Sequence, residues 1–172
     1  MEKIIQTPRL TLRPIRETDF ETTYAYTGDL EGTRYMVFLP HKTPDEARKF
    51  LRAAAREWAK PHPGYFEFAV LLQGQHIGGV ALTLCEEDGT SELGWILRRD
   101  HWGKGYATEA AQALVGFARE IGIQKLIAHC DHRNTGSYRV MEHLGMTLEK
   151  TGVRPYQEAG APVAEYQYAL TL

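Results

Sequence analysis

The chain has 172 residues, of which 43% are hydrophobic and 24% charged, and this composition and length are those of one ordinary globular domain. A formal net charge of -2 argues against a general polyanion binder, because nonspecific nucleic-acid binding depends on clustered Lys and Arg. No stretch approaches the roughly 20 consecutive apolar residues of a membrane-spanning helix, and the first residues lack a signal-peptide pattern. We therefore expect a single domain over residues 1–172, located in the cytoplasm, with reduced cysteines and with neither membrane nor nucleic acid as a partner.

The N-terminal third predicts one strand and two helices. Leu10 and Leu12 alternate with polar residues, as in a half-buried strand. Thr18 and Glu21 form a capping-box pair that predicts a short helix. A Thr-Pro-Asp-Glu sequence then predicts the start of a second helix, over about 43–60.

The middle of the chain predicts an antiparallel meander. Three segments rich in strand formers, at about 66–72, 76–84 and 91–97, are separated by short polar turns that contain glycine. Such turns join neighbouring antiparallel strands.

Beyond residue 105 the apolar period changes to that of a helix, which should end at Gly122. A short apolar strand over 125–130, a helix over 137–144 and a strand over 163–172 follow. A parallel crossover is needed at one step, from the third meander strand through the long helix. The elements therefore predict an α/β fold with a mixed sheet and helices on its faces.

The segment 98–110 joins a strand end to a helix start and contains Gly103 and Gly105. Two glycines let the backbone approach a ligand, and a helix N-terminus presents unpaired N–H groups, so phosphate is the expected ligand. The Walker pattern would require Ser or Thr after Lys104, and the dinucleotide pattern would require glycine in place of Thr108. An ordinary tight turn between strand and helix is the alternative.

Three segments in order resemble the GNAT acetyltransferases. The glycine loop resembles motif A, with Trp102, Gly105 and Ala107 at the motif positions, although Trp102 departs from the usual Gln or Arg. The segment 134–146 resembles motif B, and the segment 7–14 is similar to the opening strand of the RimJ and RimL branch. The resemblance implies a three-layer fold with about four helices on a mainly antiparallel sheet of six to seven strands, including a splayed parallel pair.

The resemblance also implies that acetyl-CoA is the cofactor. Main-chain N–H groups of the glycine loop would hold the pyrophosphate, and the preceding strand end would pair with the pantetheine. The implied cofactor-binding residues are Ile96, Leu97, Trp102, Gly103, Lys104, Gly105, Tyr106, Ala107, Thr108, Asn134 and Ser137. Considered alone, Asn134 is more typical of a helix cap.

The function predicted from the resemblance is transfer of an acetyl group to a primary amine, either a peptide N-terminus, as in the ribosomal-protein type, or a small-molecule amine. A CoA-binding regulatory module without turnover is the alternative. A metal-dependent hydrolase at the His-Cys-Asp-His sequence 129–132 is a third reading, but strand alternation divides these residues between two faces, so no metal is expected.

Amine acetylation needs a base, hydrogen-bond donors for the carbonyl and an acid for the departing thiolate. Glu92 is the candidate base, acting directly or through water, although a lone Glu in a strand is often simply solvated. Ser137 and Tyr138 are rival candidate acids, and packing on the helix face is the alternative for Tyr138. Main-chain N–H groups over 93–96, where the family has a bulge that splays the sheet, would stabilise the oxyanion.

The acceptor groove is expected from the first two helices and the loops at 29–42 and 152–162. Six aromatic and acidic residues there are candidates for receiving a cationic amine, with packing or solvation as the alternative: Tyr24, Tyr26, Asp29, Glu31, Tyr35 and Phe38. Cys85 and Cys130 are predicted to be packing residues. The oligomeric state is open, with a homodimer among the options.

Overall fold

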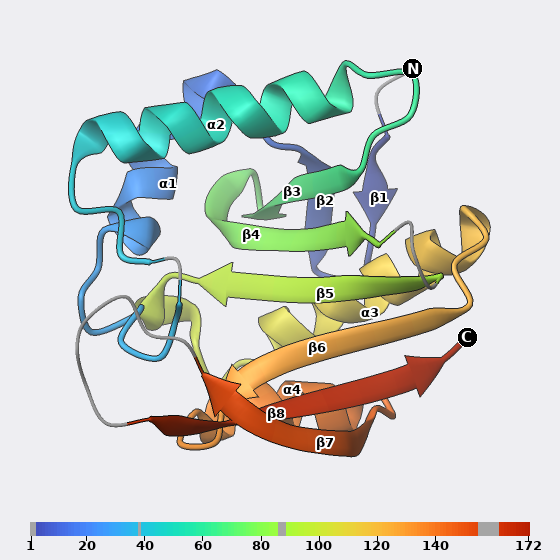
Figure 1. The fold of residues 1–172 in the computed structure, drawn as a ribbon. Helices are drawn as coiled ribbons and strands as arrows, with labels where there is room; N and C mark the ends of the chain where they lie inside the picture. The colour runs from blue at the N-terminus through green and yellow to red at the C-terminus, as the bar shows by residue number, and fades with distance from the viewer. Residues whose placement is uncertain (1–2, 38, 86–88, 155–161) are drawn as a thin grey trace.

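The computed structural model describes residues 3–37, 39–85, 89–154 and 162–172 (Figure 1). Within these ranges the chain forms one sheet of eight strands, in the order β1-β2-β3-β4-β5-β6-β8-β7, and four α-helices. The strands are β1 (Ile5–Gln6), β2 (Leu10–Pro14), β3 (Tyr65–Leu72), β4 (Gln75–Leu84), β5 (Thr90–Leu97), β6 (Lys125–Asp131), β7 (Thr147–Arg154) and β8 (Val163–Thr171). The helices are α1 (Phe20–Thr27), α2 (Pro44–Trp58), α3 (Tyr106–Glu120) and α4 (Thr135–His143).

The mixed sheet follows the predicted topology. Strands β3, β4 and β5 form an antiparallel meander, and β5 pairs with β6 in parallel through the crossover helix α3. The sheet has more strands than predicted because two edge strands, β1 and β7, escaped the sequence pattern. Every described side chain of β7 lies on the exposed surface, so this strand lacks the alternation that marks a half-buried one.

The helices cover the two faces of the sheet unequally. Helices α3 and α4 pack on one face, where the main core gathers side chains such as Phe68, Val80, Leu93 and Leu114. Helices α1 and α2 contact the other face over β3 and β4, around the smaller cluster that includes Ala69. The described helices therefore leave the same face of β5, β6 and β8 uncovered, and this face forms the floor of a site.

The predicted cap at Thr18 and Glu21 is wrong. A 3₁₀ turn over Glu17–Asp19 precedes α1, and the carboxylate of Asp19 accepts a hydrogen bond from the Arg16 N–H at 2.8 Å. Asp19 also binds Arg13 of β2 at 2.7 Å, so this tertiary ion pair positions the entry to the helix.

The other helix boundaries agree with the sequence. The Thr43 hydroxyl accepts a hydrogen bond from the Glu46 N–H at the start of α2, and Gly122 and Gly145 adopt positive φ just beyond α3 and α4. Cys130 is buried as predicted, whereas Cys85 is exposed because the chain leaves the sheet immediately after β4. None of the helices in the described ranges is both long and apolar enough to cross a bilayer.

Candidate active site

The floor of the site is built from the smallest side chains of the open sheet face. Glu67 on β3 is paired with Ala81 on β4, and Ala81 is paired with Gly94 on β5. Residues that are directly opposite or two apart in a strand share a face, so Gly79 and Glu92 belong to this face as well. Two glycines and an alanine therefore separate two carboxylates and leave a hollow between them.

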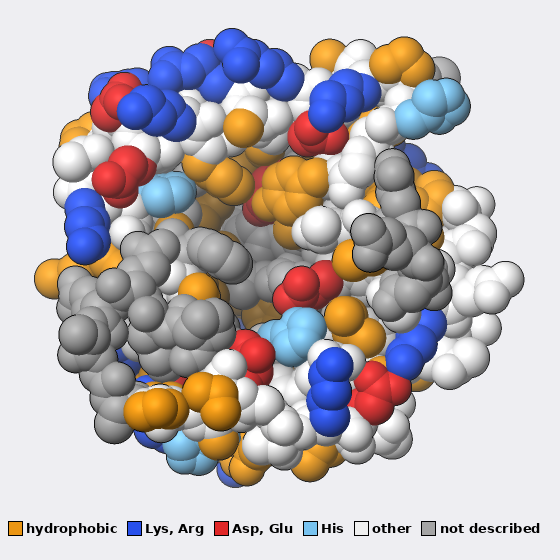
Figure 2. Space-filling view, viewed as in Figure 1, with side chains coloured by type: hydrophobic (Ala, Val, Ile, Leu, Met, Phe, Trp, Pro, Cys, Tyr) orange, Lys and Arg blue, Asp and Glu red, His pale blue; other side chains and the backbone are white. Residues whose placement is uncertain are grey.

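A cavity of about 480 Å³ occupies this hollow. Its walls include Tyr26 and Thr27 of α1, residues of the segment between α1 and α2 such as Leu39 and His41, and Phe50 of α2. Figure 2 shows the hollow at the middle of this face, with apolar and acidic side chains inside it and a row of Lys and Arg along α2 outside it. The charged lining consists of carboxylates and histidines, with neither Lys nor Arg among the described lining residues.

At one side the cavity continues into a gap between β5 and β6. These strands pair from Thr90 and Lys125 as far as Glu92 and Ile127 and then diverge, because β6 stays in register with β8 while β5 stays with β4. The expected bulge at 93–96 is wrong, since the pairing of β4 with β5 runs without a register shift. Beyond Glu92, the edge of β5 that faces the gap has no strand partner among the described residues.

The glycine loop lies at the end of β5, where α3 begins. Gly103 and Gly105 have φ of 70° and 78°, in the left-handed region that glycine adopts without strain. Gly105 is the N-cap of α3, and no described side chain caps this helix, so its first N–H groups are available to an anion. Trp102 is 50% exposed, and its indole N–H donates to the Leu97 carbonyl at 2.9 Å, which ties the loop to the strand end.

The N-terminal segment holds this loop in place. Arg9 donates to the Lys104 carbonyl at 2.9 Å and to a carboxylate oxygen of Glu109 at 2.6 Å. Thr7 donates to the other oxygen of Glu109 at 2.6 Å. Partial burial raises the pKa of the Glu109 carboxyl, but the hydrogen bonds from Thr7 and Arg9 outweigh this effect and lower the pKa. The opening segment therefore connects β2 to the first turn of α3.

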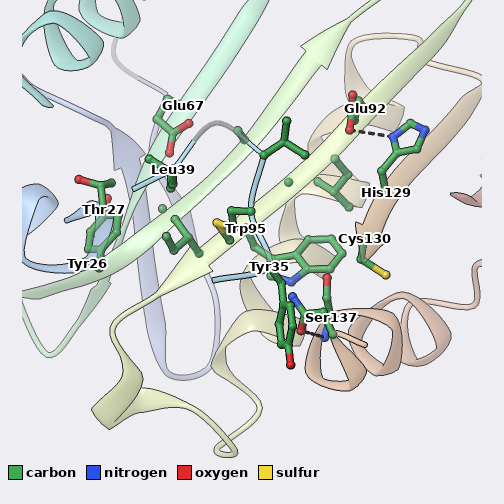
Figure 3. A pocket seen from close by; sticks show the side chains of 18 of the residues that line it. Tyr26, Thr27, Tyr35, Leu39, Glu67, Glu92, Trp95, His129, Cys130 and Ser137 are labelled. Atoms are coloured by element: carbon green, nitrogen blue, oxygen red, sulfur yellow. Dashed lines mark hydrogen bonds and ion pairs between the residues drawn. The ribbon is translucent and has the colours of Figure 1, made fainter. Parts of the chain in front are cut away.

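Glu92 and His129 face each other across the start of the gap (Figure 3). Glu92 Oε1 and His129 Nδ1 are 2.9 Å apart, and His129 Nε2 lies 2.8 Å from Gln167 Oε1. The amide of Gln167 donates to Glu149 at 2.7 Å, which leaves its oxygen to accept from Nε2–H of His129. One proton is thus shared between Nδ1 and Glu92, and this hydrogen bond, opposed by burial, raises the pKa of His129.

Glu67 lies on the opposite side of the cavity, beside Tyr26 and Thr27 (Figure 3). Glu67 is 5% exposed, and its side chain accepts a hydrogen bond from the Tyr65 hydroxyl. Burial raises the pKa of Glu67 to about 7, against the lowering effect of Tyr65. Its other oxygen lies against Gly79, where a Cβ atom would come within 2.4 Å of it. Gly79 therefore makes the room that the carboxylate occupies.

Helix α4 brings Asn134 and Ser137 to the cavity, next to the gap. The Asn134 side chain accepts a hydrogen bond from the Ser137 N–H at 3.2 Å, so Asn134 is the N-cap of the helix. The ring of Tyr138 packs at 6.1 Å from the ring of Tyr166 and is partly buried against the core. The two candidate acids therefore differ in place, since Ser137 lines the cavity and Tyr138 packs on the helix face.

The candidate acceptor-binding residues divide in the same way. Tyr26 and Tyr35 line the cavity. Tyr24 stacks on Phe20, and the two acidic residues are engaged elsewhere, Asp29 with Arg99 and Glu31 with Arg34. Phe38 and most of the predicted loop 152–162 lie outside the described residues.

Residues 9–147 match the family described as Acetyltransferase (GNAT) domain. The chain belongs to the GNAT acetyltransferase family. The protein named Uncharacterized N-acetyltransferase YnaD from Bacillus subtilis (strain 168) is 30% identical over 96% of this chain and 95% of its own length. A GNAT-family acetyltransferase from Bacillus anthracis has a similar solved structure, with a TM-score of 0.85, 29% identity and 98% of each chain covered.

The GNAT fold is also shared with the enzyme titled RimL, ribosomal L7/L12 α-N-protein acetyltransferase, solved in complex with coenzyme A. That structure has a TM-score of 0.84 and 19% identity, and the match covers 99% of this chain and 98% of the other. At this identity the likeness concerns the fold alone, and membership of the RimJ and RimL branch stays a prediction.

Within this GNAT chain, sequence reasoning missed His129 as a partner of Glu92 and missed Glu67 altogether. His129 stands in a sequence that resembles a metal site, and the signal for its other role is its place on the same strand face as Ile127, which lies opposite Glu92. The signal for Glu67 was a single acidic residue within the apolar strand β3, Tyr-Phe-Glu-Phe-Ala-Val-Leu-Leu. A carboxylate at such a position is rarely buried without a purpose.

Proposed function

We propose that this protein is an acetyl-CoA-dependent N-acetyltransferase that acts on a primary amine. The observation that carries the proposal is that one cavity is lined both by a β5 edge without a described strand partner and by a pair of proton-sharing side chains, while an α3 start without a side-chain cap follows the end of the same strand. Membership of the GNAT family supports the same reaction class.

The residues of the cofactor end fit a diphosphate with a thioester arm. N–H groups at the start of α3 and the open turn at Gly103 and Gly105 suit the pyrophosphate. Beyond Glu92 the edge of β5, which includes Ile96, pairs with no described strand and offers main-chain groups to the amides of the pantetheine arm. When bound, acetyl-CoA supplies an acyl carbon activated by a thiol leaving group.

The residues around the gap then divide the proton transfers. Glu92, held by His129, accepts the proton that the attacking amine must lose, and the hydrogen bond between them, which raises the pKa of His129, helps the pair to hold that proton. N–H groups on the β5 edge polarise the carbonyl. The hydroxyl of Ser137, which lines the cavity beside the gap, is the proposed proton donor to the thiolate, whereas Tyr138 packs away from the cavity.

The prediction leaves two classes of acceptor open, peptide N-termini and small amines, and an activity assay distinguishes them. The test is release of free CoA thiol from acetyl-CoA in the presence of N-terminal peptides, amino acids, polyamines and aminoglycosides at equal concentration. We expect turnover with at least one amine and none without an acceptor. Binding of CoA without turnover on any amine would leave the chain as a CoA-binding module, and absence of CoA binding would contradict both readings.

A further inference from the structure

Glu67 is a buried carboxylate without a described cationic partner. It forms no ion pair with a described Lys, Arg or His, and the described contact to its side chain is the neutral hydroxyl of Tyr65. Removing a carboxylate from water is costly unless a cation or several hydrogen bonds compensate. Such compensation is incomplete here, so the free protein holds Glu67 at a cost in stability.

The space beside Glu67 belongs to the cavity. The Tyr26 hydroxyl is buried with no hydrogen-bond partner among the described residues, and Tyr26 lines the same cavity. A Cβ atom on Gly79 would lie 2.4 Å from Glu67 Oε1 and 3.4 Å from the Tyr26 hydroxyl, so both oxygens approach the same point. A carboxylate and a hydroxyl that converge on one cavity wall form a site for a hydrogen-bond donor that carries positive charge.

The rest of the cavity favours a cation as well. Glu92 and Glu165 add two carboxylates to its lining, of which Glu92 is paired with His129, and the described lining includes neither Lys nor Arg. Burial lowers the pKa of His41, the histidine nearest to the α1 side of the lining, so this side chain contributes no positive charge at neutral pH. The potential inside the cavity is therefore negative at its acceptor end.

We propose that Glu67 and the Tyr26 hydroxyl bind a second, cationic nitrogen of the acceptor, and that the acceptor is an α,ω-diamine or polyamine acetylated at its other end. This inference rests on the proposed N-acetyltransferase function. Glu67 and Glu92 lie two strands and two residues apart on one sheet face, which corresponds to about 12 Å between their Cα atoms at ordinary sheet spacings. One amine can thus be anchored at Glu67 while the other reaches the Glu92 and His129 pair over the small floor residues.

The test compares diamines with monoamines of the same chain length, from propane-1,3-diamine to octane-1,8-diamine, in the CoA-release assay. We expect kcat/KM to favour the diamine by about tenfold to a hundredfold, as for a charged hydrogen bond in a buried site. The preference should rise with chain length to an optimum, because short diamines cannot span both positions. Mass spectrometry should find singly acetylated products.

Substitutions test whether Glu67 causes the preference for diamines over monoamines. Glu67→Gln keeps the size of the side chain and an acceptor for Tyr65 but removes the charge, so the diamine-to-monoamine ratio should fall to near one. Tyr26→Phe should lower the ratio severalfold, while Tyr24→Phe on the same helix, outside the cavity, is its matched control. Glu21→Gln removes an exposed charge from α1 and should leave the ratio as in the parent.

A second readout needs no turnover. A diamine alone should raise the melting temperature of the parent protein and raise that of Glu67→Gln much less, because a ligand stabilises only the state that binds it. A ratio near one in the parent, a ratio that Glu67→Gln preserves, a preference independent of chain length, or a neutral peptide acetylated faster than every diamine would each overturn the assignment. In those cases turnover of monoamines or peptides still upholds the N-acetyltransferase, whereas absence of turnover with every amine overturns both proposals.

Discussion

The proposed cofactor end of the site is built from main chain, whereas the proposed acceptor end is built from side chains carried by separate elements. At the cofactor end, the turn at Gly103 and Gly105 and the start of α3 are one continuous segment. At the acceptor end, Glu67 comes from β3, Gly79 from β4 and Tyr26 from α1. The main-chain turn can bind any ligand that carries the same diphosphate. The side chains at the acceptor end can instead be substituted one at a time. Substrate choice can therefore vary without loss of the cofactor.

The largest expected effect comes from Glu92→Gln, which touches the junction of the two ends. Loss of a positioned base should reduce kcat by about 10²- to 10⁴-fold, with the Kd for CoA close to that of the parent. The parent rate should rise as pH increases through the raised pKa of His129, since the pair accepts a proton only after it has lost its own. The variant should lose this limb of the pH profile, and NMR titration should show a lower pKa for His129. An unchanged profile would exclude Glu92 as the base.

The second prediction concerns stability at the acceptor end. The pKa of Glu67 is about 7 in the folded protein and lies above its ordinary value of 4.5, so the folded state binds the proton more tightly than the unfolded state. Its contribution to the free energy of unfolding is present below pH 4.5 and is lost as pH rises to about 7. Glu67→Gln should therefore gain up to about 3 kcal/mol relative to the parent between these limits.

Urea unfolding of the parent and of Glu67→Gln at a series of pH values measures this gain. Glu21→Gln, which removes an exposed carboxylate, is the control and should follow the parent. A difference between parent and Glu67→Gln that does not grow over this range would mean that the carboxyl is not destabilised by burial.

Gly79→Ala tests whether the acceptor end can be altered without a change in CoA binding. Gly79 lies in the extended strand β4, and its added methyl group would meet Glu67 Oε1, so the carboxylate must move. We expect kcat/KM for the acceptor to fall about tenfold or more, with the Kd for CoA unchanged. Acceptor titrations and calorimetry with CoA measure the two quantities. A higher Kd for CoA together with an unchanged kcat/KM for the acceptor would show that the two ends are not independent.

Gly105→Ala is the counterpart at the cofactor end and has the smallest expected effect. Its φ of 78° costs an alanine about 1–2 kcal/mol, which predicts an increase of about tenfold in the Kd for CoA and an unchanged KM for the acceptor. Gly116→Ala in the middle of α3 is the matched control, because its added methyl group meets no atom within 4 Å. This control should stabilise the protein by about 0.5–1 kcal/mol and leave CoA binding as it was.

Predictions from sequence succeeded for features that local sequence determines and failed where tertiary contacts decide. The meander, the crossover helix and the helix ends at Gly122 and Gly145 depend on local periodicity and turn chemistry, and the structure confirms them. The cap at Thr18 failed because Asp19 is held by Arg13 of a neighbouring strand. Strand β7 was missed because its described side chains are exposed, and it is ordered by pairing with β8.

By itself, the sequence determined the segments whose information is local: the glycine loop, the period of each long element and the order of strands and helices. The tertiary structure decided what depends on pairing register, including the divergence of β5 from β6 and the meeting of Glu92 with His129. It also decided the charge state of Glu67, because burial depends on which helices cover each part of the sheet. The alternation along a strand indicates which residues of that strand lie on the same face. The packed sheet is needed to place residues 37 positions apart within hydrogen-bonding distance.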